Sequence, residues 1–247
     1  MKEILKNRKS IRKFKTSDID NQLINQLLTD AFLSSTTGNM QLYSVVITKE
    51  KNQKEKLALS HFSQPAYMNA PVIITFCADY NRFIKWCKLR NAEPGYDNFQ
   101  SFITASIDAL LVAQTFSLLA EEQGLGICYL GTTTYNPDKI ADVLNLPKFV
   151  VPITTLAVGY PDESPEKQDR LPANGLIHYE TYKDYSDEEI NNLYEEKENL
   201  DCNKNFVAIN NKENLAQIFT DIRYTKKDNE HFSNVLLDFL KKQGFFK

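Results

Sequence analysis

The chain has 247 residues, of which 42% are hydrophobic and 25% are charged, and this is ample for one large globular domain or two small ones. Its net charge of -3 argues against a dedicated nucleic-acid-binding protein, because the basic surface of such proteins usually dominates their charge. The four cysteines form no Cys-x-x-Cys pair and have no histidine at ligand spacing, which argues against a zinc site or a disulfide framework.

The first distinctive segment is the basic run over residues 6–15, which holds six cationic side chains and no acid. Ser10 lies among the cations, and Ile11 and Phe14 are apolar, so part of the run is expected to pack against a core. Arginine forks and a hydroxyl are suitable donors for a small anion such as phosphate. Taken by itself, the run is better explained as a solvated charged segment.

The hydrophobic pattern predicts alternating helices and strands. We expect helices over residues 2–9, 19–34, 52–60, 80–92, 98–123 and 138–144, and strands over residues 43–48, 71–78, 126–131 and 150–158. Residues 162–176 are typical of an irregular connector, and further helices are expected over 187–199 and within 213–243. This alternation indicates a mixed α+β fold or a three-layer sheet.

The segment 98–123 is the longest one without glycine or proline, and its middle turns are apolar nearly all round. Such a helix is central to a large core or is buried by a partner subunit. Gly124 follows it and is a suitable left-handed residue to end the helix. The sequence has no uncharged apolar run of about 18 residues and no apolar signal segment, so we expect no membrane span and a cytoplasmic protein.

Familiar catalytic motifs are missing from the sequence. No Gly-x-Gly-x-x-Gly turn follows an expected strand, and Gly124-Leu125-Gly126 precedes one instead. Walker loops, nucleophile elbows and His-Glu-x-x-His helices are also missing, and the three histidines lie far apart. If the chain is an enzyme, a bound cofactor is therefore expected to carry the chemistry.

Several short motifs together resemble the nitroreductase superfamily of FMN proteins, in its NfsA-type, flavin-reductase-like subgroup. They follow the order and spacing of that family from residue 1 to about 183, with a looser match over the C-terminal arm. The motifs are Arg8-Lys9-Ser10-Ile11-Arg12-Lys13-Phe14, Ser34-Ser35-Thr36-Thr37 with Gln41, Ser63-Gln64-Pro65-Ala66-Tyr67, Phe76-Cys77-Ala78-Asp79, Gly124–Gly131, and Arg170-Leu171-Pro172 after Val158-Gly159-Tyr160-Pro161.

The resemblance implies a three-layer α+β sandwich with a mixed central sheet flanked by helices. The protein would form an intertwined homodimer and bind FMN non-covalently at the subunit interface. Residues 1–183 would form the FMN-binding domain, and residues 184–247 would be a helical extension of the same structural unit that wraps the partner subunit. The apolar helix over 98–123 would then lie at the dimer interface, as expected of a large obligate interface.

The resemblance also implies which residues hold FMN. They are Arg8, Lys9, Ser10, Arg12, Thr36, Gln64, Tyr129, Leu130, Gly131, Thr132 and Arg170. The first four would bind the phosphate and the ribityl chain, with Arg170 as a second clamp. Thr36 and Gln64 would bond the ribityl chain or the ring edge, and the segment 129–132 would lie along the ring. For Thr36 and Tyr129, loop solvation and core packing are nearly equal alternatives.

No side chain is expected to be catalytic, since FMN would carry the chemistry. The resemblance implies ping-pong transfer of electrons from NADPH or NADH through FMN to a small acceptor such as a nitroaromatic, a quinone or free flavin. Two alternatives stay open: other flavin chemistry, such as dehalogenation or heterocycle oxidation, and a flavin-binding or storage protein. Nucleic-acid binding through the basic run conflicts with the acidic balance of the chain.

The sequence departs from the family pattern at several positions. Lys9 stands in place of an arginine, and Gly38-Asn39-Met40 changes one pocket wall. Thr132-Thr133-Thr134 and Gln168-Asp169 each remove a cation that the family usually has. Residues 200–212 contain lysines but no arginine for the 2′-phosphate of NADPH, so we expect NADH use or relaxed selectivity.

Overall fold

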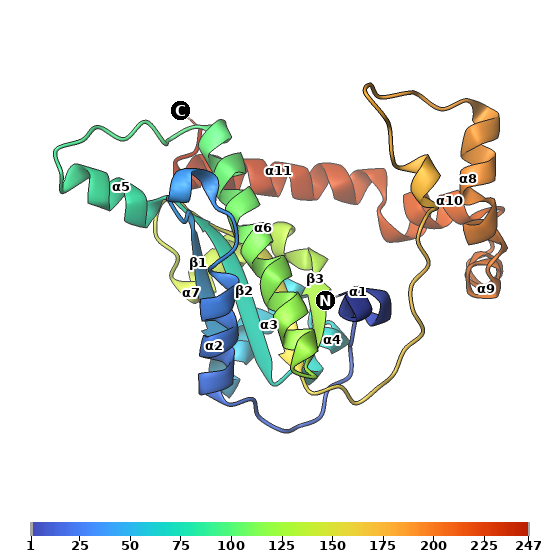
Figure 1. The fold of residues 1–247 in the computed structure, drawn as a ribbon, viewed down its shortest axis with the longest axis horizontal. Coiled ribbons are helices and arrows are strands. Elements are labelled where there is room, and N and C mark those ends of the chain that lie inside the picture. Colours follow the sequence, from blue (N-terminus) through green and yellow to red (C-terminus); the bar gives the residue numbers. More distant parts are fainter. Residues whose placement is uncertain (1, 247) are drawn as a thin grey trace. The chain divides into compact units, whose positions relative to one another are not determined.

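The computed structural model describes residues 2–246 and confirms the α+β class. The chain divides into two compact units. The first consists of Met1–Glu166 together with Phe232–Lys247, and the second is Lys167–His231. The sheet and the helices that cover it belong to the first unit, and the second unit contains short helices (Figure 1).

Four strands form one sheet in the order β1-β2-β4-β3. They are β1 (Tyr43–Thr48), β2 (Val72–Asp79), β3 (Gly126–Leu130) and β4 (Val150–Gly159). All four were expected, and their ends differ from the prediction by a single residue at most. Each of the strands is rich in β-branched or aromatic residues, which fit a pleated and buried surface.

The prediction of a mixed sheet is wrong, because the sheet is antiparallel. The three neighbouring strand pairs are antiparallel, and within residues 2–246 the parallel pairing is confined to a single bridge between Ser10 and Ile127. β2 and β3 do run in the same direction, as strands joined by a helical crossover usually do. However, β4 lies between them and opposes both, so no parallel pair forms.

Helices cover both faces of the sheet, which confirms the three-layer sandwich (Figure 1). One face packs against α2 (Asn21–Ala31) and α6 (Phe99–Glu122), and the other packs against α3 (Lys51–Ala58), α4 (Pro65–Asn69) and α7 (Pro137–Leu144). Side chains of a strand alternate between the two cores. On β2, Ile74 and Phe76 belong to the α2/α6 side, and Ile73 belongs to the other.

The remaining described elements are all helical. They are α1 (Lys2–Asn7), η1 (Thr37–Asn39), η2 (Leu59–His61), α5 (Asn81–Lys88), η3 (Gly131–Thr134), η4 (Ala173–Gly175), α8 (Asp187–Asn199), α9 (Asp201–Ile209), α10 (Leu215–Gln217), the π-helix η5 (Ile218–Arg223) and α11 (Lys226–Gln243). The acidic helix over 187–199 is confirmed residue for residue, whereas α4 and α9 were not predicted.

The helix α6 has two different apolar faces. Its small residues Ala105, Ala109 and Ala113 are fully buried, so the helix axis approaches the sheet closely. On another face, Ile107 and Leu110 are about half exposed within the chain. The helix ends as predicted, because Gly124 takes up a left-handed backbone conformation with φ of +76°.

Of the helices in residues 2–246, α6 alone is long and apolar enough to cross a membrane, judged by length and composition. Its most apolar window has a mean hydropathy of 1.6, and 44% of that window is buried within the chain. The central helix of a globular domain passes the same test, and the packing of α6 on the sheet is of that kind.

The basic run crosses the end of the sheet over two glycines. Gly126 of β3 and Gly159 of β4 are paired in register. A Cβ atom on Gly126 would lie 2.7 Å from the Ile11 side chain, and one on Gly159 would lie 2.8 Å from the ring of Phe14. Both apolar side chains are buried. They therefore anchor the run as expected, and only glycine at the paired positions permits this approach.

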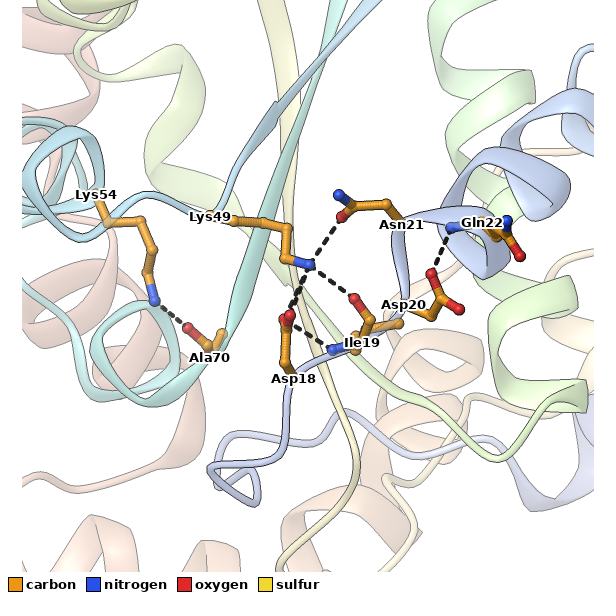
Figure 2. A network of polar contacts seen from close by, with 8 residues as sticks. All are labelled: Asp18, Ile19, Asp20, Asn21, Gln22, Lys49, Lys54 and Ala70. Carbon is orange, nitrogen blue, oxygen red and sulfur yellow. Dashed lines mark hydrogen bonds and ion pairs between the residues drawn. The ribbon is translucent and has the colours of Figure 1, made fainter.

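A polar network fixes the chain directly after the basic run (Figure 2). Lys49, at the end of β1, donates from Nζ to the carboxylate of Asp18 at 3.0 Å, to Ile19 O at 2.7 Å and to Asn21 Oδ1 at 2.8 Å. The hydrogen bond from Lys49 lowers the pKa of Asp18. The ammonium thus uses its three donors on residues 18–21 and ties the start of α2 to the sheet.

A second lysine connects α3 with α4 (Figure 2). Lys54 Nζ donates to Ala70 O, and the hydroxyl of Tyr67 donates to Lys54 O at 2.7 Å. Burial lowers the pKa of Lys54 and raises that of Tyr67. α4 begins with Pro65, which suits the first turn of a helix, and the residue before it is Gln64. These contacts give the Gln64 segment a rigid support.

The second unit is held by local polar and aromatic contacts. Ser186 and Glu189 form a capping box at the start of α8. Lys197 pairs with Asp169 at 2.6 Å, and the guanidinium of Arg223 lies 4.5 Å from the centre of the Phe206 ring. These contacts join the connector, α8, α9 and the π-helix within the unit.

Candidate functional site

The basic run lines a surface cavity of about 380 Å³. Arg8 and Lys9 contribute to its wall together with Glu121 and Gly126. The Arg8 Nε atom lies 3.8 Å from Glu121 Oε1, and Lys9 Nζ donates to Ser164 Oγ at 3.3 Å. Within residues 2–246, the guanidinium of Arg12 makes neither a hydrogen bond nor an ion pair. The charge of Arg8 is therefore partly neutralised by Glu121, whereas the guanidinium of Arg12 stays available.

Two carboxylates approach this cluster of cations. Glu163 accepts hydrogen bonds from the backbone N–H groups of Arg12 at 2.5 Å and Lys13 at 3.0 Å, and these bonds lower the pKa of Glu163. Burial raises the pKa of Glu121 against the opposing effect of Arg8, and Glu121 Oε2 is buried without a partner in residues 2–246. Two successive amides of the run thus already act as an anion site.

A second polar group lies where β3 continues into η3. Gln64 Nε2 donates to Thr132 Oγ1 at 3.0 Å, and His61 Nδ1 lies 2.9 Å from the same oxygen. Gln64 and Thr132 are half-buried, and Gly131 beside them is exposed. A Cβ atom on Gly131 would meet nothing within 4 Å. The backbone at Gly131 is therefore open to a flat ligand, and two predicted residues, Gln64 and Thr132, are in contact.

His61 is a residue of this group that sequence reasoning missed. It is fully buried, its ring stacks on Tyr67 with centroids 5.1 Å apart, and burial lowers its pKa to about 4. The buried side chain of Asn136 donates to Ser60 O at 3.0 Å and holds the turn from α7. In the sequence, the signal available for His61 was its position just before the Ser63-Gln64-Pro65 motif.

Tyr129 and Leu130 point to opposite sides of the sheet. The hydroxyl of Tyr129 donates to Gln114 Oε1 at 3.3 Å and accepts from Ser117 Oγ at 3.1 Å, both on α6. Leu130 is buried in the core against α3, α4 and α7. The side chains of both residues thus take part in core packing, and the segment 129–132 offers its backbone next to them.

Thr36 lies at the start of η1, and its side chain makes no capping hydrogen bond. The loop behind it is held by Asp108, a buried residue of α6 that the sequence did not single out. Asp108 accepts from Thr37 N at 2.9 Å and Thr37 Oγ1 at 3.1 Å through one oxygen, and from Leu42 N at 3.3 Å through the other. A carboxylate inside an apolar helix therefore sets the loop 37–42.

Arg170 belongs to the second unit. Its guanidinium donates to Gln168 O at 3.4 Å and to Asp169 O at 2.7 Å. Both acceptors are local carbonyls, so the positive charge of Arg170 is not paired with a carboxylate through these bonds. Its expected role as a second phosphate clamp stays a prediction.

The chain was compared with known proteins. A model of the nitroreductase family matches residues 5–160. A crystal structure from Bacteroides fragilis NCTC 9343 is 57% identical, with a TM-score of 0.97 over 99% of this chain and 100% of that one. The NfrA1 nitroreductase of Bacillus subtilis is 28% identical, with a TM-score of 0.86 over 98% of both chains.

A curated relative gives a further match. It is the FMN reductase (NADPH) of Bacillus subtilis strain 168, which is 32% identical over 75% of this chain and 76% of its own. The family model covers more than half of the chain, including the basic run, the Gln64 segment and all four strands. The chain therefore belongs to the nitroreductase family.

Proposed function

We propose that the chain is an FMN-dependent oxidoreductase that takes electrons from NADPH or NADH and passes them to a small-molecule acceptor. Membership of the nitroreductase family and the likeness to an FMN reductase (NADPH) carry this proposal. The residues present also fit FMN. The basic run offers cations for a phosphate, and the open space at Gly131 lets a flat ring approach the backbone.

At the phosphate end, Arg8, Lys9 and Arg12 would bind the doubly ionised phosphate, with the Ser10 hydroxyl as a further donor. Arg12 is free to do so, because its guanidinium has no partner within residues 2–246. Lys9 supplies a point charge in place of a fork, so its contact is less directional.

At the ring end, Gln64 would orient the isoalloxazine with its second amide hydrogen and its Oε1 atom, since the first amide hydrogen is engaged by Thr132. Thr36 would contact the ribityl chain, and the backbone of residues 129–132 would lie along the ring. When bound, FMN supplies the hydride and electron chemistry. The imidazole of His61 contacts Thr132, but it is buried and its pKa is lowered, so it stays neutral near pH 7. We therefore assign no catalytic side chain.

The exposed apolar face of α6 supports a homodimer. Phe99, Ile107, Leu110 and Leu111 are each more than 40% exposed within the chain, although other residues of the same helix are buried in the core against the sheet. A second copy of this chain would cover this face, and the helices from residue 184 onward would wrap around that copy. We further propose a cytoplasmic location and no nucleic-acid or membrane partner.

The nicotinamide preference is a separate part of the proposal. Residues 200–212 provide Lys204 and Lys212, and Lys212 is already paired with Asp221 at 2.8 Å. The forked donor that best matches a 2′-phosphate is missing from this segment. We therefore expect comparable use of NADH and NADPH, and a strong preference for NADPH in initial-rate measurements would contradict this expectation.

The test of the proposed function is the absorbance spectrum of the purified protein. Flavin maxima are expected, and anaerobic addition of NADH or NADPH should bleach them rapidly, with recovery after addition of a quinone or nitroaromatic. A flavin spectrum that neither nicotinamide bleaches would instead indicate a flavin-binding or storage protein. A protein that binds no FMN even when FMN is added would overturn the proposal.

A further inference from the structure

His61 is buried in a way that packing alone does not explain. Its side chain is fully buried, yet Nε2 has no hydrogen-bond partner among residues 2–246. Burying a polar nitrogen without a partner destabilises the folded state, whereas an apolar ring could stack on Tyr67 without that cost. The other nitrogen, Nδ1, has a single partner, the hydroxyl of Thr132 at 2.9 Å.

The Thr132 hydroxyl joins His61 to Gln64. Gln64 Nε2 donates to Thr132 Oγ1, so the oxygen acts as an acceptor toward Gln64. The hydroxyl hydrogen of Thr132 has no other acceptor among residues 2–246, so we assign His61 Nδ1 as its acceptor. This direction places the imidazole proton on Nε2. With this assignment, one hydroxyl group links the protonation of His61 to the orientation of the Gln64 amide.

The backbone between the two residues is held in an unusual conformation. Phe62 and Ser63 are consecutive non-glycine residues in the left-handed region, with φ of +53° and +47°. Such conformations are disfavoured and persist where surrounding contacts impose them, often next to functional sites. Here the turn brings His61 and Gln64 to the same side, facing one threonine.

We propose that His61 is a positioning residue that acts through Thr132 on Gln64. By accepting the Thr132 hydroxyl hydrogen, it fixes the amide of Gln64 with Nε2 toward the protein and Oε1 with the second amide hydrogen toward the open backbone at Gly131. This inference rests on the proposed function, because Gln64 would meet the FMN ring. His61 itself does not touch the ligand.

The first experiment measures the proton position directly, without FMN. A long-range ¹H–¹⁵N correlation spectrum of the full-length apoprotein at neutral pH should show His61 protonated at Nε2 and unprotonated at Nδ1. His61→Phe identifies the resonance by its loss. A spectrum with the proton on Nδ1 would overturn the proposed direction of the hydrogen bonds. This readout holds whether or not the chain binds FMN.

The second experiment compares three variants by fluorescence titration with FMN. His61→Phe keeps an aromatic ring for Tyr67 but has no acceptor, and a loss of affinity of roughly 5- to 10-fold is expected, as for one hydrogen bond. His61→Asn offers an oxygen near the former Nδ1 position and should restore the affinity to within about 2-fold. Thr132→Val should lower the affinity for FMN as much as His61→Phe does. The double variant His61→Phe/Thr132→Val should lower it no further than either single variant.

The outcomes separate this inference from the proposed function. If the wild-type protein binds no FMN, the proposed function fails, and the NMR result still decides the direction of the hydrogen bonds. If the wild type binds FMN and His61→Phe binds it equally well while folded by circular dichroism, the positioning role is wrong. Additive losses in the double variant would also overturn it. If His61→Phe does not fold, the FMN affinities of His61→Asn and Thr132→Val are compared instead, together with the NMR spectrum of the wild type. Equal affinities in these two variants would overturn the positioning role.

Discussion

The two regions proposed to hold FMN, one at each end of the ligand, are built on opposite principles. The basic run over residues 6–15 is charged and half-exposed, and two buried apolar side chains hold it in place. The group of His61, Gln64 and Thr132 is neutral and partly buried, and hydrogen bonds hold it together. An exposed cation attracts an anion over several ångströms, whereas a buried hydrogen-bond network fixes direction. We infer that the first end contributes affinity for phosphate and the second contributes orientation.

The largest effect is expected in the free energy of unfolding at acid pH, and it comes from His61 in the buried group. The folded-state pKa of His61 is lowered from 6.5 to about 4 because burial disfavours its charged form. The unfolded chain therefore binds more protons between these two values. The contribution of neutral His61 to the free energy of unfolding is fully present above pH 6.5. It is lost as the pH falls toward 4, which lowers the free energy of unfolding by about 3 kcal/mol.

Urea unfolding of the wild type and of His61→Phe at pH 7 and pH 4.5 measures this contribution. The carboxylates titrate in both proteins. The loss of unfolding free energy between pH 7 and pH 4.5 in the wild type, minus the loss in His61→Phe, therefore gives the contribution of His61. His231→Gln serves as a control, because the side chain of that histidine is exposed. Equal loss of stability in the wild type and His61→Phe would show that the imidazole is accessible to protons in the folded state.

The contrast between the two ends also explains what the sequence could reveal. The four strands and α6 were predicted because β-branched runs and a long segment without glycine or proline are local signals. The basic run was visible for the same reason, since its charges are consecutive. His61 and Asp108 carry no such signal, because a lone histidine or a lone aspartate in an apolar helix acquires its role only from partners far away in the sequence.

Tertiary arrangement also explains the error in the sheet. The expected alternation of helices and strands does not state which strand lies between β2 and β3. The insertion of β4 is a property of the whole core. In the same way, Gly126 and Gly159 could be located in the sequence, but their joint role under Ile11 and Phe14 depends on the register of β3 and β4.

The next effect concerns the charged end. Arg12→Ala should lower the affinity for FMN by roughly 10- to 100-fold, because it removes a charge-assisted contact to the phosphate. Lys15→Ala is the matched control from the same run: its side chain is exposed, and its backbone N–H pairs with Tyr160 O. Lys15→Ala should bind FMN almost normally. If both variants lose the same affinity, the run acts only through its overall charge.

A smaller effect should distinguish orientation from attraction. Gln64→Ala is expected to lower the affinity for FMN by about 5-fold, the scale of one hydrogen bond, while the dependence of that affinity on salt stays as in the wild type. Arg12→Ala should instead flatten the salt dependence. Titrations at 50 mM and 500 mM sodium chloride measure both quantities. A flattened salt dependence in Gln64→Ala would mean that the two ends are not separable.

The smallest effect comes from the carboxylate that already occupies the amides of the basic run. Glu163→Gln keeps an oxygen that can accept from the N–H groups of Arg12 and Lys13, so the local structure should persist. It removes a negative charge that competes with a bound phosphate for the same cations. The affinity for FMN should therefore rise by about 2- to 5-fold at low salt, and this gain should vanish at high salt.

Riboflavin provides the control for Glu163→Gln, because it has the same ring but no phosphate. Its affinity should not change, since Glu163 acts on charge at the basic run and not on the group around Gln64. An equal gain for riboflavin and FMN would indicate that Glu163 restrains the shape of the site. A loss of FMN affinity would show that the ionised carboxylate is needed to hold the Arg12 and Lys13 amides, and the charged end would then be as dependent on hydrogen-bond geometry as the buried one.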